Sequence, residues 1–372
     1  AQVQSFPLIA IPFFMLTGSL MMGGRLGEAL VGVLSALIGR FHGGPAQVGV
    51  MSSTLFGGVS GSAVADASAI GSLMLPWHRR LGYPPAFSAA TLAAAATIDI
   101  LIPPSIPMIL FALSANASIA ALFVAGIVPG LLMCAGFMGV CWWVGHRRGF
   151  PRDTTPFAWP AFRRHLLYAS PALLLPVLII VFLRLGIATP TEVAVLSTLY
   201  AGLVSAVVYR DLGWRRLNDA VVHAGLATGV VLLVIMASAA IGWLLTFDRM
   251  PDGIVQWVQS HVHSAWLVIV LMNLLMLFIG MFIDLPAAVL LLTPVFVPLA
   301  QSIGMDMTQL GIMMVVNLAL GLYTPPVGTT LFITSSLARV KVGQTVRELI
   351  PFYLVALAVL ALVSYVPASI LR

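Results

Sequence analysis

Long apolar runs constrain this chain more than any other feature of its sequence. The stretches 166–183 and 221–245 come close to or exceed the roughly 20 residues that an α-helix needs to cross a bilayer. Over the whole chain 60% of the residues are hydrophobic and only 8% are charged, whereas soluble domains carry about 25% charged residues. These properties predict a polytopic helical membrane protein, because the strands of an outer-membrane barrel would alternate apolar and polar residues.

Two of the long apolar segments, 86–114 and 308–338, are interrupted by paired prolines. The interruptions read "IPPSIP" at 102–107 and "TPPVG" at 324–328. Two consecutive prolines remove two amide donors and break a helix, and a bilayer tolerates the freed backbone only beside a cavity or a protein partner. The two breaks are therefore predicted to line a site.

An internal repeat relates the two breaks. Moving the sequence by 222 residues aligns six pairs without a gap: Gly58 with Gly280, Pro76 with Pro298, Gly82 with Gly304, Pro103 with Pro325, Pro104 with Pro326, and Ser114 with Ser336. A shared offset of this kind is the signature of duplicated architecture. We therefore predict a first half over 1–150, a two-span connector over 151–222 and a second half over 223–372.

Each half also contains a pair of short apolar segments, which we interpret as a re-entrant hairpin over 46–78 and over 265–303. Single spans are expected at 5–22, 119–145, 166–187, 190–209, 221–246 and 348–370. Five crossings then separate equivalent points of the halves, so the halves have opposite orientations. The predicted fold is all-α, with two inverted-topology repeats that each hold a re-entrant hairpin and a Pro-broken helix, as in secondary transporters. The stretches 25–42 and 248–263 are interpreted as interfacial amphipathic helices.

The basic residues test this topology. It places fifteen of the 18 Lys and Arg residues on one side of the membrane, and only Arg184, Arg249 and Arg372 on the other. The positive-inside rule makes the rich side cytoplasmic and the C-terminus periplasmic in a multi-pass protein of a bacterial inner membrane. Because the basic residues fall in short loops, the net charge of +6 is a topology signal, and no nucleic-acid partner is expected.

The stretch "FGGVSGSAVADASAIG", residues 56–71, is predicted to be the tip of the first hairpin. Its glycines permit a tight reversal, and the half-helix that follows is expected to begin near Ser62. A helix N-terminus carries about half a positive charge and free amides, which suit a carboxylate. Serine hydroxyls and freed carbonyls are oxygen ligands for a small cation, although any single serine can instead bond back to its own helix.

The repeat predicts two cation sites related by a pseudo-twofold axis. The first comprises Ser60, Ser62, Asp99, Ile102 and Pro104. The second comprises Gly280, Asp284, Gly321, Thr324 and Pro326. The substrate is expected between the two hairpin tips, with candidate contacts at Gly61, Ser62, Asp66, Ser105, Thr329 and Thr330. For Asp66, direct ion binding and a structural role as a cap or as an acceptor within the tip are equal alternatives.

Four stretches resemble the large membrane subunit of TRAP transporters, the DctM type: "FGGVSGSAVADASAIGSLMLP", "LIPPSIPMI", the run from "GMFID" to "TPVFVPLA", and "GLYTPPVGTTLF". The resemblance covers essentially the whole chain. It implies uptake of a small organic anion coupled to Na⁺ and delivered by a periplasmic substrate-binding protein. It also implies a small four-helix membrane subunit as partner, and an elevator mechanism in which a hairpin-bearing domain moves against a scaffold.

Two features depart from that family. A span that usually precedes the equivalent of Ser5 is expected to be absent here. Asp99 occupies a position that is usually glycine in the pattern "GxLIPP". If this position contributes a backbone carbonyl, the first cation site is retained, and the added carboxylate is expected to alter the number of ions or the dependence on protons.

Other functional classes leave different signatures. A self-sufficient sodium/dicarboxylate symporter, the alternative within transport, would need no binding protein. An intramembrane enzyme is disfavoured because neither HExxH nor GxSxG occurs and no histidine is expected mid-span: His223 is predicted at a helix start and the other six in loops or interfacial stretches. Cys134 and Cys141 are predicted to be core residues of one helix. A structural scaffold would not need two symmetric helix breaks, so we expect a transporter and not an enzyme.

Overall fold

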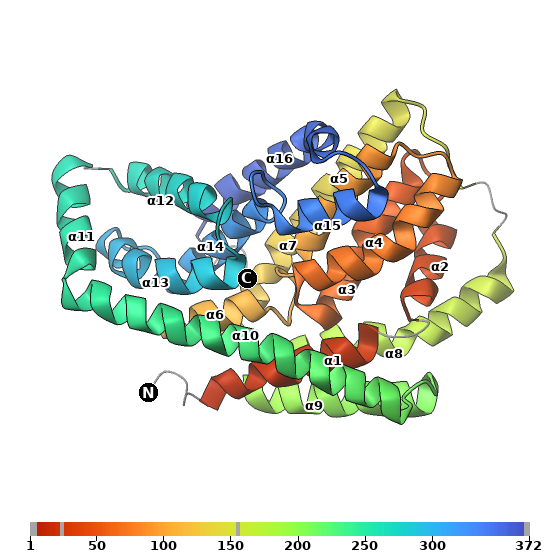
Figure 1. Cartoon of the computed structure of the whole chain (residues 1–372), viewed down its shortest axis with the longest axis horizontal. Coiled ribbons are helices and arrows are strands. Elements are labelled where there is room, and N and C mark those ends of the chain that lie inside the picture. Colours follow the sequence, from red (N-terminus) through yellow and green to blue (C-terminus); the bar gives the residue numbers. More distant parts are fainter. Residues whose placement is uncertain (1–5, 23–25, 154–156, 263, 368–372) are drawn as a thin grey trace.

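The computed structural model describes residues 6–22, 26–153, 157–262 and 264–367, and within these ranges α-, 3₁₀- and π-helices are the only regular secondary structure (Figure 1). Six helices among the described residues are long and apolar enough to cross a membrane: Ile119–Arg147, Trp159–Arg184, Pro190–Val208, Trp214–Ile241, Leu285–Ser302 and Val342–Tyr365. Five of them correspond to predicted single spans. The sixth, Leu285–Ser302, was predicted as one arm of a re-entrant hairpin.

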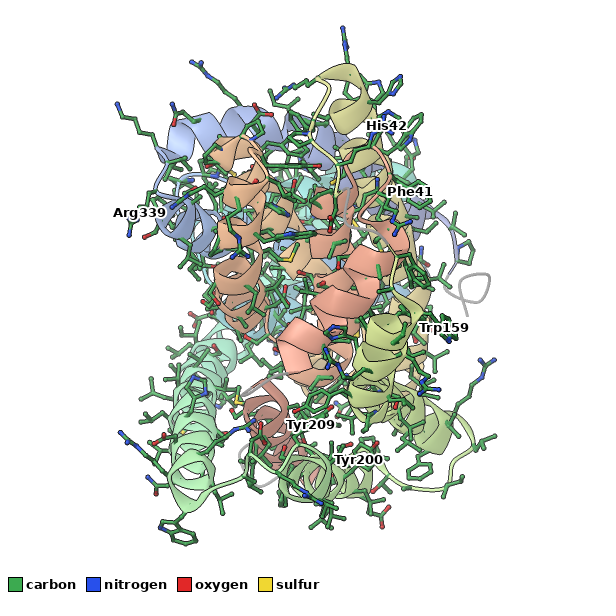
Figure 2. All side chains as sticks on the ribbon, turned by 90° about the vertical axis from the view of Figure 1, so that its right-hand side faces the viewer. Phe41, His42, Trp159, Tyr200, Tyr209 and Arg339 are labelled. Carbon is green, nitrogen blue, oxygen red and sulfur yellow. The ribbon has the colours of Figure 1, made fainter. Side chains whose placement is uncertain are left out.

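Four helices form a layer along the lower side of Figure 1: α1 (Ala10–Met22), α8 (Trp159–Arg184), α9 (Pro190–Leu203) and α10 (Trp214–Phe247). α9 starts sharply because Thr189 and Glu192 cap each other's backbone N–H groups and Pro190 occupies the first turn. The Thr198 hydroxyl donates to the Phe13 carbonyl of α1 at 2.8 Å. The Tyr200 hydroxyl, labelled in Figure 2, donates to the Pro171 carbonyl of α8 at 2.7 Å. Side chains therefore connect α1, α8 and α9.

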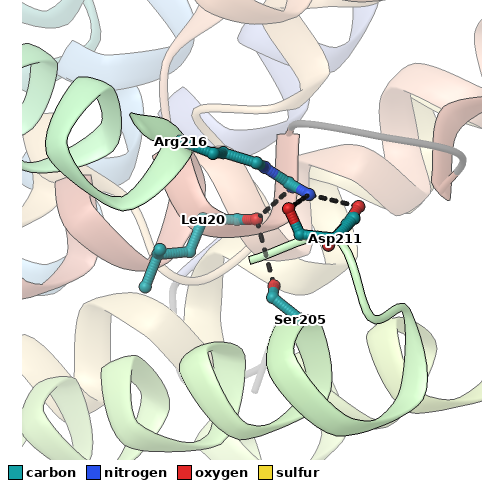
Figure 3. A network of polar contacts seen from close by, with 4 residues as sticks. All are labelled: Leu20, Ser205, Asp211 and Arg216. Atoms are coloured by element: carbon teal, nitrogen blue, oxygen red, sulfur yellow. Dashed lines mark hydrogen bonds and ion pairs between the residues drawn. The ribbon is translucent and has the colours of Figure 1, made fainter. Parts of the chain in front are cut away.

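A second polar network joins α1 to α10 (Figure 3). The Leu20 carbonyl lies in the last turn of α1, where no N–H group of the same helix is available to donate to the carbonyls. It accepts from Arg216 Nη2 at 2.9 Å and from the Ser205 hydroxyl at 3.2 Å. Arg216 also forms an ion pair with Asp211. The end of α1 is thus fixed to the start of α10 and to the short π-helix η4 (Val204–Val208) that follows α9.

Two helix pairs occupy the positions of the predicted hairpins. The first pair is α3 (Gly44–Ser60) and α4 (Ala63–Arg80), and the second is α12 (Ala265–Gly280) and α13 (Leu285–Ser302). Gly61 makes the first reversal with a φ of 63°, and Ser62 is the N-cap of α4, as expected from the tip sequence. Adding 222 to the bounds of α4 gives the bounds of α13.

Both proline pairs separate two short helices. In the first half α5 (Pro85–Ala95) and the 3₁₀ turn η3 (Ala96–Ile98) precede the break, and α6 (Ile106–Ala115) follows it. In the second half α14 (Met307–Gly321) precedes the break and α15 (Thr329–Ala338) follows it. The halves interlock, because α15 packs against α4 and α5 while α6 packs against α13 and α14. The long helices α7 (Ile119–Arg147) and α16 (Val342–Tyr365) complete the two halves.

The two stretches predicted as interfacial arms are also helical. α2 (Leu26–Ile38) precedes α3 and packs against α8, and α11 (Met250–His261) precedes α12 and packs against α10 and α13. They lie toward opposite ends of the molecule in Figure 1. In chain order α2 therefore connects α1 to the first hairpin, and α11 connects α10 to the second hairpin.

Four histidines that were predicted in loops or at a helix start lie inside helices: His78 in α4, His146 in α7, His165 in α8 and His223 in α10. His78 lies in the last turn of α4, is 1% exposed and donates from Nε2 to the Pro45 carbonyl at 3.0 Å. α4 continues through Pro76, so His78 is buried inside the helix pair and not in a loop. His223 lies inside α10, which begins at Trp214. The prediction for Cys134 and Cys141 is confirmed, because both are free, buried residues of α7.

Candidate functional site

A cavity of about 310 Å³ lies between the tips of the two hairpins. One wall comes from the first turns of three helices, and the opposite wall comes from α1 and α10. The residues of the first wall are Ser62, Ala63 and Val64 of α4, Ile106 and Pro107 of α6, and Asp284, Leu285 and Pro286 of α13. The opposite wall consists of Met15, Ala227, Val230 and Val231, and Gly61, Ile100 and Leu322 complete the lining.

Three helix N-termini therefore meet at one cavity. The first amides of a helix have no partner within the helix, and the helix dipole adds partial positive charge at that end. The N-terminus of α6 is capped by the Ser105 hydroxyl, which accepts from Met108 N–H at 3.4 Å. Asp284 occupies the N-cap position of α13 without a side-chain capping bond. The three helix N-termini contribute partial positive charge to this cavity and the Asp284 carboxylate contributes negative charge, while the remaining lining apart from Ser62 is apolar.

The first tip is held against the first proline break. Asp99 Oδ1 accepts from Gly61 N–H at 3.2 Å. A Cβ at residue 61 would overlap the Pro104 carbonyl, so only glycine allows this approach. The break thus supplies a carboxylate and a carbonyl directly at the reversal, and the structure brings Asp99 and Pro104 together as predicted.

The two serines of the tip have different surroundings. Ser60 ends α3, is 5% exposed, and its hydroxyl has no hydrogen-bond partner. Ser62 is half-buried, and its hydroxyl accepts from Ala65 N–H at 3.5 Å while the residue lines the cavity. Ser60 therefore has a buried hydroxyl beside the Asp99 carboxylate, whereas Ser62 combines capping with a position at the cavity.

Three other residues of the first half lie farther from the cavity lining. The Ile102 side chain packs toward Gly130 of α7, where a Cβ would lie 2.7 Å from Ile102 Cδ1. The Ser105 hydroxyl donates to the Ile100 carbonyl at 2.6 Å. Asp66 is fully buried in the first turn of α4, and both of its carboxylate oxygens lack hydrogen-bond partners. Neither Ser105 nor Asp66 is part of the cavity lining, although both were predicted substrate contacts.

Backbone atoms of the second hairpin tip contact the backbone of the second proline break. A Cβ at Gly321 would overlap the Gly280 carbonyl, so the two glycines bring the ends of α12 and α14 into contact. Val327 N–H donates to the Met281 carbonyl at 3.2 Å and links the same two segments. The structure therefore brings Gly280 and Gly321 together, as the second predicted cation site requires.

The other predicted residues of the second half are spread over the break. Asp284 is exposed at the cavity, and Pro326 is also exposed. The Thr324 hydroxyl donates to the Leu320 carbonyl at 2.6 Å. The hydroxyl of Thr330 is fully buried and contacts the Ala93 and Leu322 carbonyls, and that of Thr329 is buried without a partner. Neither Thr329 nor Thr330, the two predicted substrate contacts, lines the cavity.

Sequence reasoning missed the wall contributed by α1 and α10. Met15, Val230 and Val231 are apolar residues of apolar helices, so nothing in the sequence separates them from residues that face lipid. It also missed Ser53, which is 1% exposed and has an unpartnered hydroxyl. Its position seven residues before Ser60 places both on one face of α3, and this spacing was a signal available in the sequence.

Relatives of this chain share nearly its whole length. It is 56% identical to a protein of Sinorhizobium fredii named y4mL, over 99% of this chain and 88% of that protein. It is 36% identical to the 2,3-diketo-L-gulonate TRAP transporter large permease protein YiaN of Escherichia coli, over 99% and 86%. It is 36% identical to the C4-dicarboxylate TRAP transporter large permease protein DctM of Pseudomonas aeruginosa, over 98% and 85%. The latter two relatives are permease subunits and not enzymes.

A solved structure and a family model agree with these relatives. The YdaH transporter of Alcanivorax borkumensis has a similar fold, with a TM-score of 0.66 at 16% identity over 96% of this chain and 84% of that one. The family model for the DctM component of tripartite ATP-independent periplasmic transporters matches residues 1–369. This chain, a multi-pass membrane protein with a cavity between two helical hairpins, therefore belongs to the DctM family of TRAP transporter large permease subunits.

Proposed function

We propose that this permease subunit imports a small organic acid anion together with Na⁺. A periplasmic substrate-binding protein delivers the anion, and a small four-helix membrane subunit completes the transporter. The observation that carries the proposal is the cavity of about 310 Å³ on which the N-termini of α4, α6 and α13 converge. Helix N-termini bind carboxylates through free amides and the helix dipole.

The substrate class is supported by the relatives. Two of their names state transport of 2,3-diketo-L-gulonate and C4-dicarboxylates, and a further relative, from Vibrio cholerae and 34% identical over 98% of this chain, is named as a sialic acid TRAP transporter large permease protein; all three substrates are organic acids. A cavity of about 310 Å³ is near the lower end of the range for ligand pockets, roughly 300–1,000 Å³. We therefore assign a small organic acid as the substrate class of this chain.

The charge of the cavity supports the proposed coupling to Na⁺. The Asp284 carboxylate lies at the cavity and repels an anionic substrate until a cation binds beside it. The first Na⁺ site is formed by Ser60, Ser62, Asp99, Ile102 and Pro104, and the second by Gly280, Asp284, Gly321, Thr324 and Pro326. Binding of Na⁺ at the two tips reduces the repulsion and raises the affinity for the anion, which couples the two fluxes.

Alternating access is proposed to occur by an elevator movement of inverted repeats. The matching helix bounds at an offset of 222 residues support the repeat. The division of the cavity supports the movement, because the hairpin tips and proline breaks form one wall while α1 and α10 form the other. The hairpins and broken helices then move as a unit against α1, α8, α9 and α10, with α2 and α11 as hinged arms.

Uptake into proteoliposomes tests the transport proposal. The chain is reconstituted with its small subunit, and radiolabelled C4-dicarboxylate, 2,3-diketo-L-gulonate and sialic acid are offered in turn with the purified binding protein. We expect uptake of one acid that requires both an inward Na⁺ gradient and the binding protein. Uptake that persists when choline replaces Na⁺ would exclude sodium coupling, and uptake without the binding protein would identify a self-sufficient symporter.

Cysteine labelling tests the elevator. In a background with Cys134→Ala and Cys141→Ala, a cysteine at Ser62 is expected to react with a membrane-impermeant maleimide from the cytoplasm in one state and from the periplasm in the other. Leu185→Cys is the matched control, because Leu185 follows α8 and is 69% exposed outside the moving unit. Labelling of the Ser62 cysteine from one side only, whatever the Na⁺ and substrate present, would contradict the movement.

A further inference from the structure

Five buried oxygen atoms behind the first hairpin tip have no hydrogen-bond partner. They are Oδ1 and Oδ2 of Asp66, Oδ2 of Asp99, and the hydroxyl oxygens of Ser53 and Ser60. The four residues are between 0% and 5% exposed. Buried polar atoms are almost always paired, and an unpaired carboxylate oxygen is especially costly. A group of five therefore indicates a ligand that binds to these oxygens.

The packing of α3, α4 and η3 brings these residues together. Ser53 and Ser60 share a face of α3, and Gly57 between them lets Asp99 approach, since a Cβ at residue 57 would lie 2.9 Å from Asp99 Oδ1. The Ser53 hydroxyl lies beside the Asp66 carboxylate without the geometry of a hydrogen bond. The Asp66 and Asp99 carboxylates are close enough to interact electrostatically. The oxygens of Ser53, Asp66 and Asp99 are therefore neighbours behind the tip, and the Ser60 hydroxyl lies beside Asp99.

The charges at this position do not balance with a single cation. Neither Asp66 nor Asp99 forms an ion pair with a described residue. The helices α1, α3, α5 and α15 contain no ionisable side chain, and the basic residues of α4 lie in its last turn, at the end opposite Asp66. One Na⁺ at the hairpin tip would leave one negative charge buried at membrane depth, which is strongly unfavourable.

We propose that Asp66, Ser53 and the free oxygen of Asp99 bind an additional Na⁺ ion behind the tip. This inference rests on the proposed function, because it adds a second ion to the first Na⁺ site. Hard cations bind several oxygen ligands at once, and carboxylates and hydroxyls are such ligands. A proton shared by the two carboxylates would occupy two of their oxygens and leave the Ser53 oxygen uncoordinated, whereas a cation contacts Asp66, Ser53 and Asp99 together. Two Na⁺ ions also balance the two carboxylates.

Equilibrium binding of ²²Na⁺ to the purified full-length protein tests the proposal directly. We expect Asp66→Asn to lower the number of Na⁺ ions bound at saturation by about one per protein, since the amide keeps the shape and removes the charge. Ser53→Ala removes one ligand and is expected to weaken binding of the same ion severalfold. Thr54→Val is the matched control, because the Thr54 hydroxyl lies on the same helix but is bonded to the Val50 carbonyl at 2.9 Å. It should leave Na⁺ binding unchanged.

The outcomes separate this inference from the proposed function. If the unmodified protein binds no Na⁺, the sodium-coupled function itself fails. If it binds Na⁺ but neither Asp66→Asn nor Ser53→Ala changes the number or affinity of the ions, only the additional site is rejected. If Asp66→Asn retains the number of ions but removes a dependence of Na⁺ binding on pH, the position holds a proton and the proposal is overturned. Ser53→Ala keeps the test decisive if Asp66→Asn fails to fold.

Discussion

The two hairpin tips have matching backbones and different chemistry. At the first tip a reversal at Gly61 presents buried side-chain oxygens of Ser60 and Asp99, and two of these, Ser60 Oγ and Asp99 Oδ2, have no hydrogen-bond partner. At the second tip α12 and α14 meet through Gly280 and Gly321, and the only carboxylate, Asp284, is exposed at the cavity. Helices of nearly the same bounds therefore present side-chain oxygens at one tip and a close backbone contact at the other.

The polar residues behind the second tip are used for packing. Asn317 Nδ2 donates to Asn273 Oδ1 at 2.8 Å, and Asn273 Nδ2 donates to the Ser364 hydroxyl at 3.0 Å. The positions that correspond to these asparagines at the offset of 222 are Met51 and Ala95. In the second half amide side chains thus tie α12 to α14 and α16, whereas behind the first tip Ser53, Ser60 and Asp66 have oxygens without hydrogen-bond partners. A duplicated fold can therefore retain its backbone geometry while the two halves use different polar side chains.

The variant with the largest expected effect on uptake distorts the backbone of the first tip. Gly61→Ala is expected to abolish uptake, because residue 61 has a φ of 63° and a Cβ would overlap the Pro104 carbonyl. Such strain costs up to about 3 kcal/mol, or roughly a hundredfold fewer molecules with the native tip. Uptake per correctly inserted protein measures the effect.

Two variants control for this change. Gly304 also has a positive φ, 71°, but no atom lies near a Cβ there, so Gly304→Ala tests backbone strain without overlap and should retain most of the uptake. In the second turn no residue of 281–284 has a positive φ, so Ile283→Ala, at the position that matches Gly61, should also be tolerated. Equal losses in Gly61→Ala and Ile283→Ala would show that the two tips do not differ in the way described.

The sequence predicted the tips better than the cavity. The start of α4 at Ser62 and the reversal at Gly61 follow from local rules, because serine caps helices and glycine adopts a positive φ. The two double-proline breaks were equally clear. The wall formed by Met15 and Val230 could not be predicted, because an apolar side chain that faces a cavity and one that faces lipid are chemically alike.

Among the predicted site residues, those placed by backbone geometry were also predicted better than those that depend on packing between helices. Residues held by backbone geometry, such as Gly280 and Gly321, are brought together. Hydroxyl residues were harder to assign, because a serine or threonine can bond to a nearby carbonyl, as Ser105 and Thr330 do. Which hydroxyls stay free depends on packing between helices distant in sequence, and the repeat alone does not encode it.

The second prediction tests whether serine side chains at the first tip bind Na⁺. Ser60→Ala with Ser62→Ala should raise the Na⁺ concentration for half-maximal uptake by roughly thirtyfold, since two lost oxygen ligands cost about 1 kcal/mol each. Uptake measured over a Na⁺ series at saturating substrate checks this. An unchanged Na⁺ dependence would remove both hydroxyls from the first site.

The third prediction concerns the exposed carboxylate of the second tip. Asp284→Asn keeps the size and removes the charge, and we expect about a fivefold rise in the half-maximal Na⁺ concentration, because interactions of solvent-accessible charges are worth about 1 kcal/mol. The charge moved per substrate should also fall, as measured by the reversal potential in proteoliposomes. A reversal potential identical to that of the unmodified protein would assign Asp284 a structural role as the N-terminal residue before α13.

The smallest predicted effect separates side-chain from backbone ligands within the second break. The Thr324 hydroxyl donates to the Leu320 carbonyl at 2.6 Å, so its proton is directed into its own helix turn, and we expect Thr324 to contribute through its backbone carbonyl. Thr324→Val removes the hydroxyl and keeps the shape, so the half-maximal Na⁺ concentration should change by less than about twofold, with at most about 1 kcal/mol of stability lost with the hydrogen bond. The same Na⁺ series of uptake measurements checks this, with the Ser60 and Ser62 double variant as the positive control. A shift as large as that of the double variant would mean that the second site also depends on side-chain oxygens, and the contrast between the two tips would then be wrong.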